Sequence, residues 1–366
     1  MKVFFTALCA LALSGSAHAV STLGYDLRAD YQFVNYNDAA NFPAYQRFYL
    51  KTGRLYFKGN LNERISYEVR WAFSKPAVET TPIANAGRDS LNSSVEYANV
   101  TDKMSDMFAL TVGKFNTEMG GFEGATSGSD LYLVTPNYGH QAALTLTGKN
   151  LGINQSGANN LLYATGIKGD FTTNDQHIYI LATNNQGDAQ DANNKFNQNR
   201  GILGMTWKAT FAEKTWGALI SYHEVSPQAQ VVATDPGNKH SFISVGAKYE
   251  KDDYFGMLDY STTEYKDGLS GSKDTLWSAL FKLGYKIDQW TPRLEVYTAE
   301  ESVGIGATTG KNKFMGYGAV LEYKPTADNF RYHVAYNSVT TKPIAGNDLM
   351  KSEIVVGARL FGDFLK

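Results

Sequence analysis

Hydrophobic and polar residues alternate with a period of two along most of this chain. From Leu23 to Phe33 every odd-numbered residue is apolar or aromatic, and polar or charged residues fill most positions between them. The segments from Ile65 to Phe73 and from Ile243 to Tyr249 alternate in the same way. A period of two is that of a β-strand whose two faces meet different surroundings. The pattern therefore predicts an all-β protein.

Sixteen segments of about ten residues carry this alternation. We expect strands near residues 23–35, 45–59, 64–74, 93–100, 107–115, 161–170, 176–184, 200–210, 215–224, 240–250, 254–264, 275–285, 291–300, 313–324, 329–339 and 351–361. A further apolar alternation from Ala143 to Leu146 fits an extra hairpin, which would raise the number of strands to eighteen.

The connections between these segments alternate in length. Short turns such as 60–63 and 251–253 follow the even-numbered strands, and longer connections rich in Asn, Gly and Ser follow the odd-numbered ones. Both chain ends then lie on the side of the short turns. This is the layout of a transmembrane antiparallel barrel with short periplasmic turns and long extracellular loops.

A soluble β-sandwich also alternates, and two features favour the barrel. Aromatic residues stand at both ends of the apolar face, as Trp216 and Tyr222 do on one strand and Trp277 and Tyr285 on another. Such spacing fits the two aromatic girdles of an outer-membrane barrel. The polar face carries charges on nearly every strand, and a dry sandwich core would hold them only at a large free-energy cost. A water-filled lumen tolerates them.

The first residues have the features of a bacterial export signal. Lys2 supplies the positive charge, residues 3–13 the apolar stretch, and Ala17-His18-Ala19 a small-residue cleavage site. We expect residues 1–19 to be a signal peptide and residues 20–366 to form a single barrel domain in the outer membrane. Cys9 is the only cysteine, so the mature chain holds no disulfide.

Composition and charge narrow the function classes. The 23 Tyr, 20 Phe and 34 Gly against 9 Pro are typical of β proteins. With 34 Lys and Arg against 36 Asp and Glu, the net charge of −2 provides no basic surface for nucleic acid. We expect no nucleic-acid partner.

Motifs for catalysis are missing from the sequence. The glycine-rich stretch from Gly304 to Asn312 lacks the glycine spacing and the Ser or Thr of a phosphate-binding loop. There is no GxSxG or HExxH motif, and the histidines are scattered singly. We therefore expect no enzyme activity, no metal site and no cofactor.

Charged residues on the polar faces are expected to line the lumen. We single out eight of them as pore-lining: Arg28, Arg54, Arg70, Glu68, Lys208, Lys248, Arg331 and Arg359. With the other charges on those faces, such as Lys282, Asp26 and Glu295, the basic and acidic residues are equal in number. A balanced lining passes small polar solutes with weak selectivity. The same residues also have the chemistry to pair with one another and support the wall.

The connection from residue 116 to residue 160 is the longest. A connection of this length is usually functional, and a sixteen-stranded barrel would otherwise enclose a wide aqueous hole. We expect it to be a third loop folded into the lumen as a constriction. It carries Glu118, Glu123 and Asp130 with no Lys or Arg between Lys114 and Lys149. We expect these carboxylates to lie opposite Arg28, Arg54 and Arg70, and to give near-neutral or weakly cation-preferring conduction.

Three stretches resemble a known family. Residues 50–59 with 65–69, residues 110–115 and residues 166–189 are similar to strand motifs of the phosphate-selective porins O and P. The resemblance implies a trimeric, sixteen-stranded porin with passive channel activity. Lys51 and Thr52 replace two of the three arginines in the family's first motif, and Arg54 is the third.

Together these features predict an outer-membrane diffusion porin for small hydrophilic solutes and ions, filtered by size and charge at the internal loop. The expected partners are outer-membrane lipid, lipopolysaccharide, the solutes and, through the resemblance, two further copies in a homotrimer. The alternative is a structural or adhesive outer-membrane barrel whose lumen is blocked.

Overall fold

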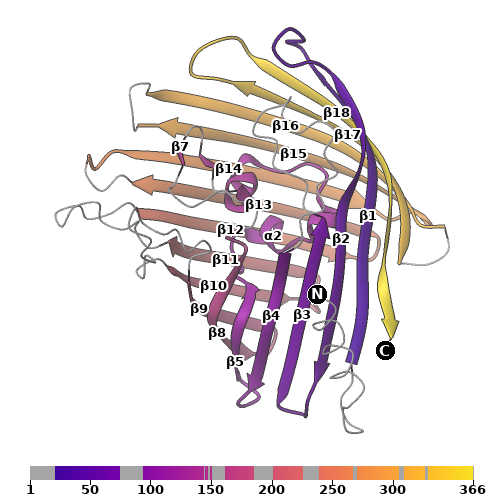
Figure 1. Ribbon diagram of the computed structural model, residues 1–366, viewed down its shortest axis with the longest axis vertical. Coiled ribbons are helices and arrows are strands. Elements are labelled where there is room, and N and C mark those ends of the chain that lie inside the picture. Colours follow the sequence, from indigo (N-terminus) through magenta and orange to yellow (C-terminus); the bar gives the residue numbers. More distant parts are fainter. Residues whose placement is uncertain are drawn as a thin grey trace.

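A computed structural model describes residues 21–74, 94–143, 145–146, 149–150, 161–184, 201–225, 239–266, 270–304, 309–325 and 329–365. Sixteen antiparallel strands form one closed barrel (Figure 1). They are β1 (Ser21–Tyr36), β2 (Tyr45–Asn60), β3 (Ile65–Ser74), β4 (Ser94–Lys103), β5 (Phe108–Asn116), β8 (Tyr163–Thr173), β9 (Gln176–Asn184), β10 (Gly201–Phe211), β11 (Trp216–Val225), β12 (Lys239–Lys251), β13 (Tyr254–Lys266), β14 (Lys273–Tyr285), β15 (Trp290–Val303), β16 (Gly310–Tyr323), β17 (Phe330–Lys342) and β18 (Leu349–Leu365).

The first and last strands close the barrel. β1 pairs with β18 from Leu23 opposite Leu365 to Tyr36 opposite Lys351, so neither strand is left with a free edge. The sixteen strands match those expected from the alternation. The possible extra hairpin is a separate two-stranded sheet, β6 (Thr145–Leu146) with β7 (Lys149–Asn150), and adds nothing to the wall. The barrel therefore has sixteen strands, not eighteen.

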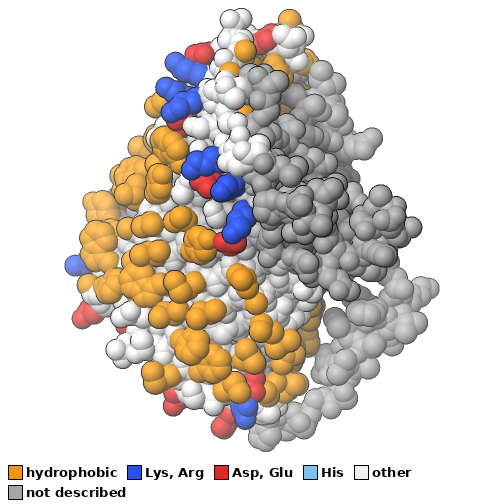
Figure 2. Space-filling view, turned by 90° about the vertical axis from the view of Figure 1, so that its left-hand side faces the viewer, with side chains coloured by type: hydrophobic (Ala, Val, Ile, Leu, Met, Phe, Trp, Pro, Cys, Tyr) orange, Lys and Arg blue, Asp and Glu red, His pale blue; other side chains and the backbone are white. Residues whose placement is uncertain are grey.

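Apolar side chains cover the outside of the wall. Ile220, Leu258 and Leu294 are each about half exposed, because they point away from the barrel. Figure 2 shows a broad hydrophobic area on the outer surface with charged side chains at its margins. No helix in the described part of the chain is long and apolar enough to cross a membrane.

Aromatic pairs border this apolar band at both ends. On the side of the short turns, rings on neighbouring strands contact each other at a tilt, with centroids 4.8 Å apart for Trp216 and Tyr249 and 4.5 Å apart for Tyr254 and Tyr285. Nearer the long loops, the ring of Tyr260 lies 6.2 Å from that of Trp277. Two girdles on either side of an apolar band are the signature of an outer-membrane barrel.

The buried residues inside the barrel lie between the wall and the connection that joins β5 to β8. One apolar cluster contains Met119 and Leu161 of that connection with Ile202 and Phe242 of the wall. Smaller clusters surround Tyr132 and Leu133. The connection is therefore packed against the inner wall and carries its own share of the apolar core.

Candidate functional site

The connection between β5 and β8 enters the lumen as three short helical segments. These are α2 (Gly121–Ala125), the 3-10 turn η1 (Gly128–Asp130) and α3 (Pro136–Ala143). Figure 1 shows α2 inside the ring of strands. We call residues 117–143 the internal loop. Its backbone and side chains bond inward-facing residues on both sides of the barrel, as the following contacts show.

The first anchor of the internal loop is on β8, β10 and β11. The carboxylate of Glu118 pairs with Lys208 and, at 3.4 Å, with Lys168. His223 Nε2 donates to the carbonyl oxygen of Thr117 over 2.6 Å. Although burial opposes it, the two ammonium groups lower the pKa of Glu118. Glu118 is therefore ionised and held by two cations.

The second anchor joins α2 to β13. The backbone N–H of Glu123 donates to Asp259 Oδ2 over 2.6 Å. The Glu123 carboxyl group turns back into the loop and accepts from Thr135 N over 2.9 Å and from Thr135 Oγ1 over 2.7 Å. Gly246 provides the space, because a Cβ there would lie 2.8 Å from Phe122. Glu123, 3% exposed, has its pKa raised by burial. It fixes the loop's shape and faces no solute.

The third anchor is the turn around Ser129, which meets β1 and β2. Arg28 Nη1 donates to the Ser129 carbonyl oxygen over 2.8 Å, and Ser129 Oγ donates to Asp26 Oδ2 over 2.6 Å. Arg54 Nη1 donates to Ser127 Oγ over 3.1 Å. Arg28 also pairs with Asp30 at 2.9 Å, so a carboxylate of the same strand helps to hold the Arg28 side chain in position.

Asp130 connects the same turn to the end of the chain. Its carboxylate accepts from Arg359 Nη1 over 2.6 Å and bonds Arg331. Burial alone would raise the pKa of Asp130, but the two guanidinium charges dominate and lower it to about 2. The turn is thus bonded to β1, β2, β17 and β18 together.

Tyr132 forms the fourth anchor. Its ring contacts two guanidinium groups, whose central carbons lie 4.2 Å (Arg28) and 4.9 Å (Arg293) from the ring centre. Its hydroxyl donates to Glu322 over 3.0 Å, and its carbonyl oxygen accepts from Asn337 over 3.1 Å. Two cation–π contacts and two hydrogen bonds fix the position of Tyr132 relative to β1, β15, β16 and β17.

Asn137 fixes α3 on β13 and β14. Its amide nitrogen donates to the carbonyl oxygens of Ser261 and Leu276, each over 3.0 Å, and its amide oxygen accepts from Thr263 over 2.8 Å. The side chain is fully buried. Sequence reasoning considered only the charged residues of the loop and so missed Ser129, Tyr132 and Asn137. The sequence signal that could have found these three residues is the presence of polar and aromatic side chains within a long connection.

Comparison with known proteins identifies the class. The family model for phosphate-selective porin O and P matches residues 22–262. The chain belongs to this porin family. No curated protein sequence matches the chain.

Solved structures share the fold of this porin. An OmpT loop-deletion mutant of Vibrio cholerae is 12% identical with a TM-score of 0.64, and 94% of this chain covers 99% of it. The outer membrane channel DcaP of Acinetobacter baumannii is 12% identical with a TM-score of 0.60, over 95% of this chain and 98% of its own. OmpF of Salmonella typhi is 13% identical with a TM-score of 0.59, over 93% and 97%. At such identities the likeness concerns the fold.

All eight residues expected to line the pore lie at inward-facing positions of the porin wall. Arg54 and Arg70 each bond Glu96 Oε2 over 2.9 Å, and the Arg70 guanidinium lies 3.8 Å from the ring of Tyr97. Glu68 pairs in register with Lys58 across β2 and β3, and Lys248 lies 5.6 Å from the ring of Phe122. The sequence did not single out Glu96, which two arginines share.

The turn around Ser129 lies against Arg28 and Arg54, but the loop carboxylates form their ion pairs elsewhere. Glu118 and Asp130 pair with Lys168, Lys208, Arg331 and Arg359, and not with Arg28, Arg54 or Arg70. The cause is the path of the internal loop, which reaches β8 and β10 before it crosses to β1. Arg28 itself is 2% exposed, so it anchors the loop and does not face open lumen.

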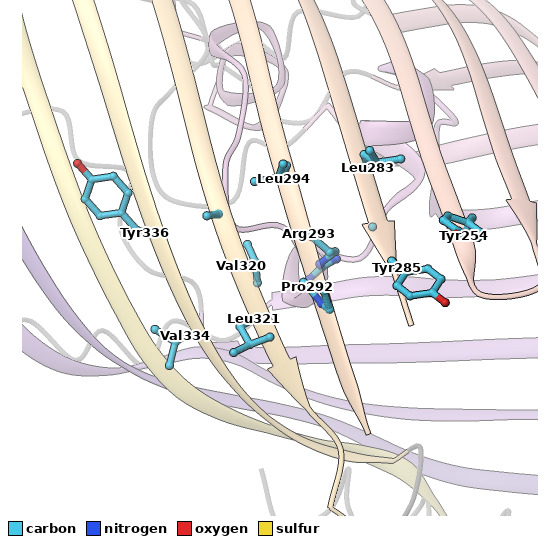
Figure 3. Close-up of a pocket in the computed structure, with 12 residues that line it drawn as sticks. Tyr254, Leu283, Tyr285, Pro292, Arg293, Leu294, Val320, Leu321, Val334 and Tyr336 are labelled. Carbon is cyan, nitrogen blue, oxygen red and sulfur yellow. The ribbon is translucent and has the colours of Figure 1, made fainter. Parts of the chain in front are cut away.

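An apolar groove of about 560 Å³ lies elsewhere, between β13 and β17. Figure 3 shows its lining, which includes Tyr254, Leu283, Pro292 and Val334. Most of these side chains occupy outward positions of their strands, near the girdle at the short turns. The groove belongs to the membrane-facing surface and is separate from the lumen.

Proposed function

We propose that this porin lets small hydrophilic solutes and ions diffuse through the outer membrane, and that the internal loop filters them by size and charge. One observation carries the proposal. A loop held by ion pairs and hydrogen bonds crosses a lumen whose inward faces are charged, inside a wall whose outward face is apolar. Membership of a porin family supports it.

The solute path lies between the internal loop and the inner faces of β2 to β10. On that side charged groups keep part of their surface in water: Lys208 is 25% exposed, Arg70 19% and Glu118 14%. On the opposite side Leu133 packs into a buried cluster with Leu280 and Tyr297. The loop also packs against β8 to β12 through the cluster around Met119, so the partly exposed charged groups on β2 to β10 are what mark the proposed path.

The charge of this path favours weak selectivity. Glu118 faces two lysines, and Glu96 faces two arginines. Glu118 and Glu96 are paired acids, and the second basic group beside each of them works against a cation preference. Because acidic and basic residues are nearly equal in number over the whole chain, we expect near-neutral conduction and no cation preference.

Assembly and export complete the proposal. We infer that residues 1–19, which lie outside the described residues, are removed as a signal peptide. We also infer that three copies form a homotrimer, so that part of each apolar band is covered by protein. Lipopolysaccharide and phospholipid surround the remainder. The proposed channel uses no cofactor or metal and performs no catalysis.

Swelling of liposomes in sugars of increasing size tests the filter. Liposomes that contain the intact porin should admit small sugars and exclude larger ones. A variant without residues 120–130 loses α2 and most of the Ser129 turn, and should admit sugars that the intact protein excludes. A Glu63→Gln variant, changed in a periplasmic turn, is the control. An unchanged size limit after the deletion would contradict filtration by the loop.

A further inference from the structure

Lysines stand directly opposite one another on the outer face of the barrel, at its extracellular end. Lys239, Lys266 and Lys273 occupy paired positions of β12, β13 and β14. Lys313 and Lys342 are paired in the same way on β16 and β17. All five side chains are exposed. We call these two sets the lysine rows.

Such pairing is unfavourable without a counter-charge. Like charges directly opposite each other on one face of a sheet destabilise the strand pair. Acids offset part of the charge: Lys273 pairs with Glu264 at 2.8 Å, Lys239 with Glu224 at 3.7 Å and Lys342 with Asp348 at 3.5 Å.

Lys266, the central member of the first row, has no such partner. Among the described residues it forms no ion pair, and it stands opposite a lysine on each side. Lys313 stands between Lys342 and Glu300, and Glu300 also bonds Lys311, so the second row is partly neutralised. The first row is therefore the place where an anion would relieve most repulsion between neighbouring ammonium groups.

The position of both lysine rows along the barrel axis shows which layer of the membrane surrounds them. Lys273 is four residues above Trp277 on β14, and Lys313 is four residues above Tyr317 on β16. Four residues of strand span about 13 Å along the strand, which is about 10 Å of height at the usual tilt of a barrel strand. Trp277 and Tyr317 belong to the girdle nearer the long loops, where ring stacks with Tyr260 and Tyr336 mark the edge of the apolar band. The lysine rows thus lie at the level of lipid headgroups.

We propose that the two lysine rows bind phosphate groups on the headgroup of an anionic lipid in the outer leaflet. The lysine ammonium carries three donors and a compact charge, which suits a phosphate shared by neighbouring lysines. The acyl chains of the same lipid would lie against the apolar band below. The proposal rests on the membrane location and is independent of channel activity.

Thermal unfolding in detergent tests this proposal. Bisphosphorylated lipid A should raise the unfolding temperature of the intact porin, and the same lipid stripped of its phosphates should not. The double variant Lys266→Gln with Lys313→Gln should bind lipid A more weakly, by about fivefold for each lysine removed. Lys214→Gln with Lys251→Gln, at the periplasmic end, is the matched control and should respond as the intact protein does.

The stability of the variant without lipid shows whether a weaker response to lipid A comes from lost binding or from misfolding. In lipid-free detergent the single variant Lys266→Gln should be at least as stable as the intact protein, because Lys266 stands between two lysines and their repulsion is reduced. An equal response of the double variant and the intact protein to lipid A would overturn the proposal. Equal stabilisation by dephosphorylated lipid, or by inorganic phosphate alone at the same phosphate concentration, would also overturn it.

Discussion

The guanidinium group of Arg28 lies 4.2 Å from the centre of the Tyr132 ring, and this contact joins the first strand of the barrel to the loop inside it. Arg28 also pairs with Asp30 at 2.9 Å, and the guanidinium group of Arg293 lies 4.9 Å from the centre of the same ring. The position of the loop in the lumen therefore depends on residues that are far apart in the chain. Several contacts of this kind, and not one, fix the loop in the lumen.

Removal of the Tyr132 ring should loosen the internal loop. The Tyr132→Ala variant loses two cation–π contacts, each about 1 kcal/mol, and the hydrogen bond to Glu322. We expect larger and noisier single-channel currents from a barrel that still folds. The control Tyr132→Phe keeps the stacked ring and should lie close to the intact protein. Identical currents from all three proteins would show that this anchor does not set the path.

The Asp130 anchor should resist acid. Its folded-state pKa of about 2 is below the ordinary value of 3.8, so its stabilising contribution is complete above pH 4 and is lost only as the pH falls towards 2. Titration of Asp130 should therefore cause no change in the single-channel currents of the intact porin between pH 7 and pH 4. Asp130→Asn should show the loosened loop at pH 7.

This pH experiment has a control variant and a result that would contradict the prediction. Asp106→Asn changes an exposed carboxylate in a periplasmic turn and should leave the currents unaltered. A transition of the intact protein near pH 4 that Asp130→Asn abolishes would mean that Asp130 titrates like an ordinary carboxyl group. The proposed double pairing with Arg331 and Arg359 would then be wrong.

The outward face of β11 offers a test of membrane contact. Ile220 is 48% exposed in the apolar band, so Ile220→Arg should destabilise the barrel by about 2–4 kcal/mol in lipid. Thr210→Arg adds the same charge at an inward, partly exposed position of β10 and should be mild. Ser221, the inward neighbour on β11, is an unsuitable control because it is only 2% exposed. Urea unfolding in vesicles measures both, and equal losses would refute the assignment of faces.

The assembly state is open to a direct measurement. A trimer should have about three times the monomer mass after solubilisation in a mild detergent, when the mass of the bound detergent is subtracted. Light scattering combined with refractive index and absorbance gives that mass. A species that remains monomeric at every protein concentration would rule out the proposed homotrimer.

Sequence and structure agree where the information is local. The period of two from Leu23 to Phe33 reports which side chains face lipid, because each strand meets lipid on one side and the lumen on the other. The alternation of short and long connections likewise gives the strand number and the two rims. These features require no knowledge of which distant residues meet.

The contacts of the internal loop depend on distant residues and were not predictable in the same way. Arg28 and Ser129 are 101 positions apart, and Asp130 and Arg359 are 229 positions apart. The charge of Glu118, Glu123 and Asp130 indicated that they would meet basic residues, but not which ones. Among the residues that the structure describes, Glu123 pairs with no basic side chain, and its carboxyl group bonds Thr135. A count of charges contains no information about the path of the loop.

Single-channel recording in a planar bilayer tests the central claim most directly. The purified, folded porin should produce discrete, stepwise currents in symmetrical salt, and near-zero reversal potential in a salt gradient. The variant without residues 120–130 should produce larger steps under the same conditions. A correctly folded protein that inserts into the bilayer and passes no current, with or without the deletion, would contradict the account and favour a structural or adhesive barrel.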